Sequence, residues 1–276
     1  MNNPKLKLLV DLDQTLVYCT DIPKETFPSP PADTFYVESV RCFVNIRPYT
    51  AEFLESSLAR YYEMTVVTLA RRPYAEDVVE KLDPEQKLFG GRIVSRDELA
   101  DPFSKTKNLD ALFPEGLKQT AIIDDSVEVW DNRSNVVRVL PYCFVDENDD
   151  VLKHMERVLI EAHRRFHEHY RRTEELLDME LVFQELQEEI LQGETVVLSG
   201  FSSTEKADLI ECLIRFGAAV RTKMSDQVTV VVAERSTPEV VEAEKLEIPV
   251  VSRGWVDDVQ RRWKKAEFSE FALTAI

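Results

Sequence analysis

The sequence lacks long apolar runs, and cysteine is scarce in it. No stretch of about 18 consecutive apolar residues occurs, so we expect no membrane-spanning helix. The short segment before the first apolar run also lacks the features of a secretory signal. The four cysteines stand far apart, without the paired spacing of a zinc site, at Cys19, Cys42, Cys143 and Cys212. We interpret them as reduced, mostly buried thiols of an intracellular protein, and we expect no disulfide framework.

A strongly basic segment is also absent. The chain carries 34 Lys and Arg residues against 51 Asp and Glu residues, and its formal net charge is −17. Because nucleic-acid binding depends on clustered cations along a phosphate backbone, we expect no direct contact with DNA or RNA. An acidic surface also repels a phosphorylated substrate at long range, so a phosphate site requires a local concentration of cations.

Glycine and proline nearly disappear in the middle of the chain, and this change divides the sequence. A chain of 276 residues is long enough for two compact domains. After residue 146 helix formers dominate, and apolar residues recur at helical spacing from Leu152 to Phe166. We predict a first domain over 1–146, a helical bridge over 147–193 with a second helix at Thr173–Leu191, and a second domain over 194–276.

The first domain alternates apolar runs with amphipathic stretches, which is typical of an α/β sheet. The polar, proline-rich segment Asp21–Asp33 is predicted to be a loop. The apolar runs predict core strands at Lys5–Asp11, Met64–Leu69, Thr120–Ile123 and Val136–Leu140. We also predict helices at Tyr49–Tyr61 and Tyr74–Leu82, and an antiparallel pair formed by Phe35–Glu38 and Cys42–Ile46.

Two aspartates follow the first predicted strand directly. In an open α/β sheet, ligands bind at the carboxyl ends of the strands, and residues two apart there project to the same side. Asp11 and Asp13 can therefore face one bound phosphate. One carboxylate would attack phosphorus as a nucleophile, and the other would protonate the leaving oxygen and later deprotonate water. The alternative is a pair of loop aspartates that cap the next turn.

Four ordered blocks of sequence carry a family resemblance. They are DLDQTLVY at Asp11–Tyr18, RPYTAEFL at Arg47–Leu54, VVTLARRPYAEDVVEKLDP at Val66–Pro84, and SRDELADPFSKTKNLDALFP at Ser95–Pro114 followed by AIIDDSVEVWD at Ala121–Asp131. The chain thereby resembles the haloacid-dehalogenase superfamily, and within it the TFIIF-associating (Fcp-type) phosphatases of the RNA polymerase II carboxy-terminal domain. The resemblance implies a Rossmann-like α/β phosphatase domain, a nuclear protein, and hydrolysis of phosphoserine in the repeat tail of the polymerase.

The matched blocks contain four aspartates, and the resemblance brings them to one point. Four formal negative charges beside a phosphate dianion require a cation, and Mg²⁺ prefers carboxylate, carbonyl and water oxygens. As in the family, Asp11 and Asp125 would bind Mg²⁺ through side chains and Asp13 through its carbonyl. Asp124, which we also count among the metal residues, would position Lys107 or the metal-bound water. A simple turn after the strand is the alternative for Asp124 and Asp125.

The remaining site candidates would hold the phosphate or the substrate. Thr68 lies at the carboxyl end of the second predicted strand, where its hydroxyl and the following N–H groups can hold phosphate oxygens. Lys107 aligns with the phosphate-binding lysine of the family, with Lys105 as the alternative. Our substrate-binding candidates are Thr15, Arg47 and Tyr74. Arg47 is equally compatible with an ion pair that holds the start of a helix, and Tyr74 with a place in the core.

The second domain resembles a BRCT module. The resemblance rests on VVLSGF at Val196–Phe201, FGAAV at Phe216–Val220, TVVVA at Thr229–Ala233 and VVSRGW at Val250–Trp255. Phosphopeptide-binding members hold phosphate with a Ser or Thr, the next Gly, and a lysine on a later helix. Ser199 and Gly200 match the first part, but Glu239 stands at the later helix start with no lysine nearby. We therefore expect a scaffold or docking role for this module.

The function most consistent with these observations is a Mg²⁺-dependent phosphatase. Its partners would be the phosphorylated polymerase tail and, from the resemblance, the transcription factor TFIIF. Two alternatives stay open: a phosphatase for another nuclear phosphoprotein, and a non-catalytic binding protein on the same fold. The histidines all lie in the bridge, and His163 and His167 are spaced for one helix face, but we expect them to be structural rather than a metal pair.

Overall fold

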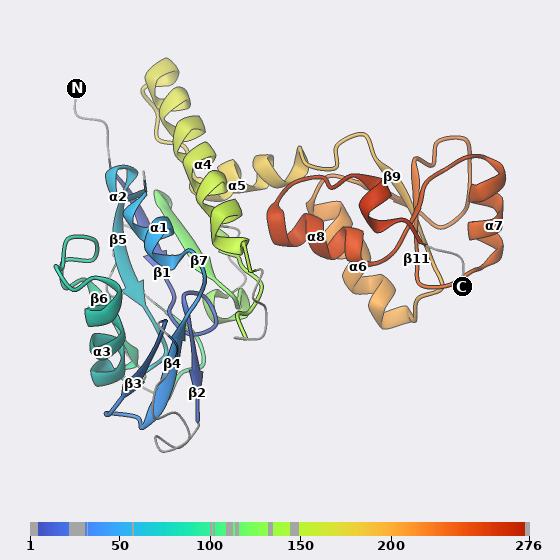
Figure 1. Ribbon diagram of the computed structural model, residues 1–276. Coiled ribbons are helices and arrows are strands. Elements are labelled where there is room, and N and C mark those ends of the chain that lie inside the picture. The colour runs from blue at the N-terminus through green and yellow to red at the C-terminus, as the bar shows by residue number, and fades with distance from the viewer. Residues whose placement is uncertain are drawn as a thin grey trace. The chain divides into compact units, whose positions relative to one another are not determined.

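The computed structural model divides into two compact units, at 1–183 and 184–276, and each is described by itself (Figure 1). The structure describes residues 5–21, 31, 33–56, 58–99, 101, 103–108, 113, 116–131, 135–143 and 149–273. Most of the loop predicted at Asp21–Asp33 lies outside this set. Within the described ranges, no helix combines the length and the apolar character needed to cross a bilayer.

The first unit is built on a parallel five-stranded sheet. Its strands are β1 (Leu6–Val10), β5 (Tyr62–Val67), β6 (Ile93–Val94), β7 (Thr120–Asp124) and β8 (Val136–Arg138), in the order β6-β5-β1-β7-β8. The central strand β1 pairs in parallel with β5 and β7. The four predicted core strands are confirmed, whereas the two-residue strand β6 was not predicted. Most side chains of β1 and β7 are apolar and buried, as expected of parallel strands covered on both faces.

A small antiparallel sheet interrupts the chain after β1. It consists of β2 (Val17–Thr20), β3 (Thr34–Val37) and β4 (Cys42–Ile46), in the order β2-β4-β3. The predicted pair is present as β3 and β4, and β2 adds an unpredicted strand on the other side of β4. Phe43, Val44 and Val37 are buried, so this sheet is part of the core of the unit.

Three helices of the first unit pack together. The predicted helix at Tyr49–Tyr61 is two short helices, α1 (Thr50–Glu55) and α2 (Leu58–Tyr61). They are separated at Ser56, whose hydroxyl donates to the Phe53 carbonyl and accepts from the Leu58 amide. Both helices contact α4 (Val151–Thr173), and α3 (Arg72–Leu82) contacts β3 and β6.

The predicted helical bridge is divided between the two units. The apolar positions of α4 from Leu152 to Phe166 are buried, and the Tyr62 hydroxyl donates to the Leu159 carbonyl, so α4 is part of the first unit. Glu174 takes a positive φ and ends α4, and α5 (Met179–Glu188) begins five residues later. The single helix predicted at Thr173–Leu191 is therefore wrong. The domain limits that we drew at 146 and 193 stay predictions.

The second unit contains a parallel four-stranded sheet. Its strands are β9 (Thr195–Ser199), β10 (Ala219–Arg221), β11 (Val230–Ala233) and β12 (Val250–Val251), in the order β10-β9-β11-β12. In Figure 1 this sheet lies between α7 (Pro238–Lys245) on one side and α6 (Ser203–Arg215) and α8 (Gly254–Arg262) on the other. A short 3-10 helix, Phe268–Phe271, follows α8, and Ala272 after it forms an isolated bridge with Val251.

Two residues fix local packing in the second unit. Gly217 has a φ of +89°, and a Cβ there would meet the Glu188 carbonyl oxygen at 1.8 Å, so only glycine fits this turn. The Trp255 side chain is fully buried, and its indole N–H donates to the Ala266 carbonyl.

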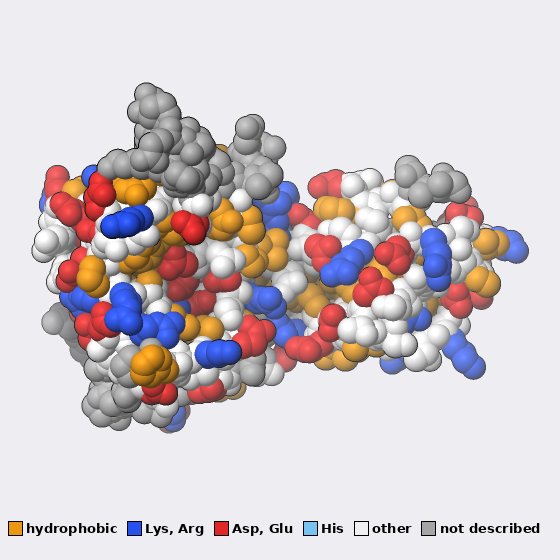
Figure 2. Space-filling model, turned by 90° about the horizontal axis from the view of Figure 1, so that it is seen from below, with side chains coloured by type: hydrophobic (Ala, Val, Ile, Leu, Met, Phe, Trp, Pro, Cys, Tyr) orange, Lys and Arg blue, Asp and Glu red, His pale blue; other side chains and the backbone are white. Residues whose placement is uncertain are grey.

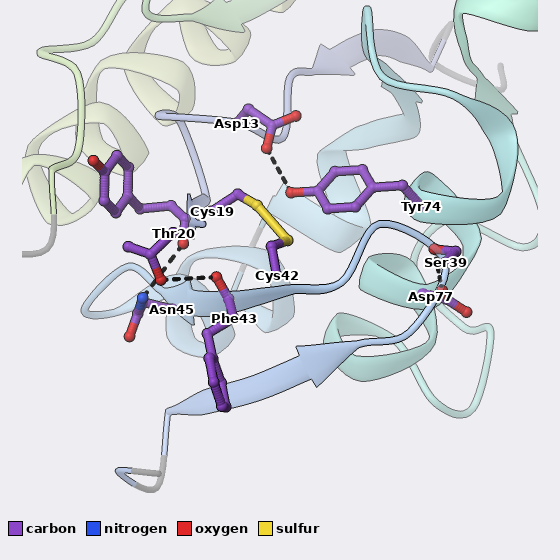
Figure 3. The surroundings of a disulfide bond; sticks show 10 residues. Asp13, Cys19, Thr20, Ser39, Cys42, Phe43, Asn45, Tyr74 and Asp77 are labelled. Atoms are coloured by element: carbon purple, nitrogen blue, oxygen red, sulfur yellow. Dashed lines mark hydrogen bonds between the residues drawn. A yellow bond between two sulfur atoms is a disulfide. The ribbon is translucent and has the colours of Figure 1, made fainter. Parts of the chain in front are cut away.

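The prediction of four reduced, mostly buried cysteines is wrong. Cys19 and Cys42 form a disulfide, with their Cα atoms 6.3 Å apart (Figure 3). Their separation of 23 residues gave no signal, because β2 was not predicted and only its pairing with β4 brings the thiols together. Cys143 is exposed and Cys212 half-buried, so the free thiols are not buried either.

Candidate active site

Three adjacent strands of the first unit end at the candidate active site. Asp11 follows β1, Thr68 follows β5, and Asp124 is the last residue of β7. The Asp11 amide donates to the Ile123 carbonyl, and the Thr68 amide donates to the Val94 carbonyl, so the sheet itself positions these residues. All three side chains are buried. The parallel topology therefore collects residues from distant parts of the sequence at one edge.

Lys107 lies between two of the aspartates. Its Nζ atom is 2.5 Å from Oδ1 of Asp11 and 2.6 Å from Oδ2 of Asp124. Burial lowers the pKa of Lys107, but the two carboxylates outweigh burial and the net pKa is raised. The lysine thus stays protonated and supplies the local positive charge that the acidic surface required. Lys105, the alternative, is exposed.

Asp11, Asp124 and Asp125 form the one group among the described residues that could hold a metal ion. One carboxylate oxygen from each lies within 4.8 Å of the other two. Burial raises the pKa of Asp11 well above its usual value, and repulsion from Asp124 and Asp13 adds to this effect. Burial and the charge of Asp124 raise the pKa of Asp125 to about 6.

Burial is the main cause of both raised pKa values, and Lys107 does not offset it, so the ionised carboxylates are poorly stabilised by the protein alone. A divalent cation with oxygen ligands stabilises ionised carboxylates, so the donor set fits a metal such as Mg²⁺. Figure 2 shows acidic side chains gathered in the middle of one face of the first unit, with Lys and Arg side chains around them.

Asp13 stands apart from the metal group and has its own partner. The Tyr74 hydroxyl donates to Oδ1 of Asp13 at 2.5 Å (Figure 3). Burial raises the pKa of Asp13, and the hydrogen bond from Tyr74 opposes this rise. Tyr74 itself is buried, with only 4% of its surface exposed. The structure thus shows Tyr74 holding Asp13, a contact that the sequence did not suggest.

Two threonines of the site support the loops around it. The Thr68 hydroxyl accepts from the Ala70 amide at 3.0 Å and so fixes the turn after β5. The Thr15 hydroxyl accepts from the Asp125 amide at 3.1 Å and ties the loop after β1 to the metal group. Thr15 is fully buried, so its contacts favour this supporting role over the substrate-binding role that we predicted.

Arg47 takes the structural one of the two roles that the sequence left open. Its Nε and Nη2 atoms donate to Asp149 at 3.1 and 2.9 Å, and further hydrogen bonds run to the carbonyls of Gln14, Thr15 and Leu140. The Arg47 side chain has no exposed surface. The prediction that Arg47 binds substrate is not supported, because every donor group is directed at the protein interior.

Two residues of the site were missed. The Trp130 indole N–H donates to Oδ2 of Asp124 at 2.7 Å, and Asp149 anchors Arg47 beside the loop after β1. Trp130 lies within a block that matched the family, which was an available signal. Asp149 lies 102 residues from Arg47, and no local pattern connects them.

The histidine pair on α4 is used in packing. The Tyr61 ring stacks on His163 at 4.2 Å between ring centroids, and His163 lies equally close to His167. Burial lowers the pKa of His163 to about 4, so the imidazole is neutral. This arrangement agrees with the structural use that we expected.

In the second unit, the Ser199 hydroxyl is hydrogen-bonded to other side chains of the same unit. It donates to Oε2 of Glu239 at 2.8 Å and lies 2.8 Å from the Thr237 hydroxyl. Ser199 is 4% exposed. The carboxylate of Glu239 thus takes the hydrogen bond that a bound phosphate would need, which supports the expectation drawn from the missing lysine.

Comparisons with known proteins agree with this geometry. Residues 6–170 match the family model described as NLI interacting factor-like phosphatase, and residues 186–260 match the BRCA1 C Terminus (BRCT) domain. The predicted family resemblance and the α/β fold class are confirmed.

Curated relatives are named as phosphatases of the C-terminal domain of RNA polymerase II. The Caenorhabditis elegans protein is 36% identical over 307 residues, which cover 99% of this chain and 46% of the relative. The human protein is 40% identical over 153 residues, which cover 54% of this chain and 16% of the relative. This chain therefore spans less than half the length of these relatives.

A solved structure has the same fold over nearly the whole chain. The structure of Fcp1, an essential RNA polymerase II CTD phosphatase, is similar with a TM-score of 0.78 and 24% identity, and the match covers 98% of this chain and 96% of that one. Because the phosphatase model matches more than half of the residues, this chain belongs to the NLI interacting factor-like phosphatase family, with a BRCT domain after the phosphatase domain.

Proposed function

We propose that this protein is a Mg²⁺-dependent phosphatase that removes phosphate from serine residues in the C-terminal repeat tail of RNA polymerase II. The observation that carries the proposal is the buried cluster of Asp11, Asp124 and Lys107 at the carboxyl edge of the sheet. The reaction class follows from this cluster. The substrate follows from the names of the curated relatives, which are polymerase tail phosphatases.

In the first step, a carboxylate oxygen of Asp11 attacks the phosphorus atom of phosphoserine. The bond from phosphorus to the serine oxygen breaks as the aspartyl phosphate forms, and Asp13 gives its proton to the departing serine oxygen. The raised pKa of Asp13 makes a protonated carboxyl available for this role. Lys107 offsets the charge on the phosphoryl group as a point cation, and the loop after Thr68 orients the phosphoryl oxygens.

In the second step, water attacks phosphorus and frees the Asp11 carboxylate. Asp13, now ionised, takes the proton from this water and returns to its starting state. The hydrogen bond from Tyr74 keeps the Asp13 carboxyl in one orientation through both steps. Asp13 therefore acts as acid and then as base at the same position.

The metal would be held by the side chains of Asp11 and Asp125 and by the carbonyl of Asp13. When bound, Mg²⁺ neutralises charge on the phosphoryl oxygens during transfer. Asp124 has another task, because its Oδ2 atom already accepts from Lys107 and Trp130. Asp124 thus keeps the lysine beside Asp11.

The surroundings of the site suit an extended polymer. In the described part of the segment between Thr15 and Arg47, the chain forms only the small sheet β2-β4-β3, and this sheet is packed into the core. A serine on an unfolded tail can reach such a site. A polymerase tail as substrate implies a nuclear protein, and TFIIF is a proposed partner on the basis of the resemblance alone.

The test is turnover of a phosphoserine peptide with the heptad sequence of the polymerase tail. Wild-type protein with Mg²⁺ is expected to release phosphate, EDTA to abolish release, and Asp11→Asn to be inactive while still folded by circular dichroism. Retained turnover in Asp11→Asn would overturn the nucleophile assignment. Equal turnover of unrelated nuclear phosphopeptides in competition would instead favour the broader phosphatase.

A further inference from the structure

The disulfide in the small sheet joins two strands that face the phosphatase body. Cys19 lies opposite Val44 in the pairing of β2 with β4, and Cys42 is two residues from Val44 on the same strand. Since successive side chains of a strand point to opposite faces, both sulfur atoms project from one face of the sheet. Val17, Val44 and Cys42 of this face are buried.

The surroundings of the disulfide include catalytic candidates. Figure 3 draws Asp13 and Tyr74 in the neighbourhood of the sulfur atoms, with the Tyr74 hydroxyl donating to Asp13. The turn after β3 is tied to α3, because the Ser39 hydroxyl donates to Asp77 at 2.8 Å. The sheet thus lies next to the helix that carries Tyr74.

Different contacts hold the two ends of the pair β2–β4. At the end that adjoins the loop after β1, the Arg47 amide donates to Leu16, and the Arg47 side chain is anchored by Asp149. At the other end, where β2 ends at Thr20 and β4 begins at Cys42, the Thr20 hydroxyl donates to the Phe43 carbonyl at 3.2 Å, and the disulfide is the covalent tie. Opening the disulfide therefore leaves Asp11 supported, and β4 stays held by its pairing with β3 and by the Ser39–Asp77 bond. The far end of β2 is then attached to β4 by hydrogen bonds alone.

We propose that Cys19 and Cys42 form a reversible thiol–disulfide site that locks the small sheet as a wall for the peptide substrate. This inference rests on the proposed function, since the wall matters only for a substrate that extends beyond its phosphate. A phosphopeptide gains contacts along an ordered wall and loses them when the far end is free to move.

Forming the Cys19–Cys42 bond requires an oxidant, and a small-molecule disulfide can serve. Two cysteine thiols react with a small-molecule disulfide such as oxidised glutathione to give the Cys19–Cys42 bond and two molecules of the small thiol. The cysteine sulfurs lose two electrons and two protons, and the reagent gains both. Cys19 is half-buried and Cys42 is buried, so an incoming thiolate reaches the disulfide at Cys19.

The first experiment maps the bond without using activity. After exposure to oxidised glutathione and tryptic digestion, mass spectrometry is expected to find peptides 8–24 and 42–60 joined, and a dithiol to separate them. Cys19→Ser should abolish the joined species, and Cys143→Ser, the matched control at an exposed free cysteine, should retain it. Absence of the joined peptides in oxidised wild type would contradict the proposed thiol–disulfide site.

The second experiment compares kinetics of the oxidised and reduced protein. For a phosphoserine heptad peptide, KM is expected to be about threefold to tenfold lower in the oxidised form. For a small aryl phosphate, kcat and KM should be the same in the oxidised and reduced forms. The KM of Cys19→Ser for the peptide should equal that of reduced wild type in either buffer. Equal KM values for the peptide in both forms would contradict the proposed role of the sheet in peptide binding.

The two proposals can fail separately. If the protein hydrolyses the aryl phosphate but not the peptide, the polymerase proposal fails, and the result of the bond mapping still stands.

Discussion

Among single residues, Lys107 decides the charge balance of the site. It is the cation that contacts Asp11 and Asp124 at 2.5 and 2.6 Å inside the protein. A buried pair of carboxylates without a cation would take up protons, as the raised pKa of Asp11 indicates even with Lys107 present. The lysine therefore supplies one positive charge. The carboxylates of the site need further positive charge to stay ionised.

The pKa of Asp125 leads to a prediction about protons. Its pKa is raised from the ordinary 3.8 to about 6, so without metal the folded protein binds this proton more tightly than the unfolded chain. The contribution of Asp125 to stability is thus present at low pH and is lost as pH rises through about 6. A bound cation favours the ionised carboxylate, so Mg²⁺ binding should release this proton near pH 6 and release much less near pH 8.

Calorimetric titration of Mg²⁺ in buffers of different ionisation enthalpy measures this release. Asp125→Asn should reduce the release near pH 6, and Glu128→Gln, at a neighbouring exposed carboxylate, should not. Release that is identical in wild type and Asp125→Asn would contradict the metal-ligand assignment.

Among the secondary-structure elements, β4 and α4 are joined by a buried ion pair. Arg47 directly follows β4 and Asp149 lies just before α4, and their side chains are 0% and 7% exposed. Removing one partner of such a pair leaves an uncompensated charge in the interior. Arg47→Met is therefore expected to lower the free energy of unfolding by about 3–5 kcal/mol.

The matched control is Arg71→Met, because Arg71 forms an exposed pair with Asp97. This change should alter the free energy of unfolding by less than about 1 kcal/mol in urea denaturation. A stable Arg47→Met protein with a strongly raised KM would restore the substrate-binding role that the sequence also allowed.

The ends of α7 and β9 carry a prediction for the BRCT domain. Ser199 ends β9, and its hydroxyl donates to Glu239 in the first turn of α7. In an Asp11→Asn background, which removes turnover, Ser199→Ala should leave the affinity for phosphoserine peptides unchanged in fluorescence polarisation. Glu239→Gln, which removes the carboxylate charge, should raise that affinity. Weaker binding in Ser199→Ala would show that the domain holds phosphate in spite of Glu239.

The elements also show what the sequence could and could not predict. Asp11, Thr68 and Asp124 were predictable at one edge because each stands at the end of an apolar run, and parallel strands end together. The contact from Tyr74 to Asp13 and the pair Arg47–Asp149 depend on packing between distant segments, which no periodicity reports. The strand β2 is only four residues long, and missing it hid the disulfide.

For the whole molecule, a net charge of −17 coexists with the proposed site for a dianionic ester. The two are compatible because burial isolates the site, where Lys107 and a bound divalent ion would act over short distances in a medium of low dielectric constant. The phosphatase domain supplies this environment from within the first unit alone. The chemistry of the chain is therefore expected to survive changes to the BRCT domain.

The most direct test of this account is a crystal structure with Mg²⁺ and beryllium fluoride, which mimics a phosphoryl group on a carboxylate. We expect beryllium on a carboxylate oxygen of Asp11, with Lys107 beside the fluorines and Mg²⁺ bound by Asp11, Asp125 and the Asp13 carbonyl. A structure in which Asp11 stays unmodified, or in which the acidic cluster takes up no metal at saturating Mg²⁺, would contradict the enzymatic account.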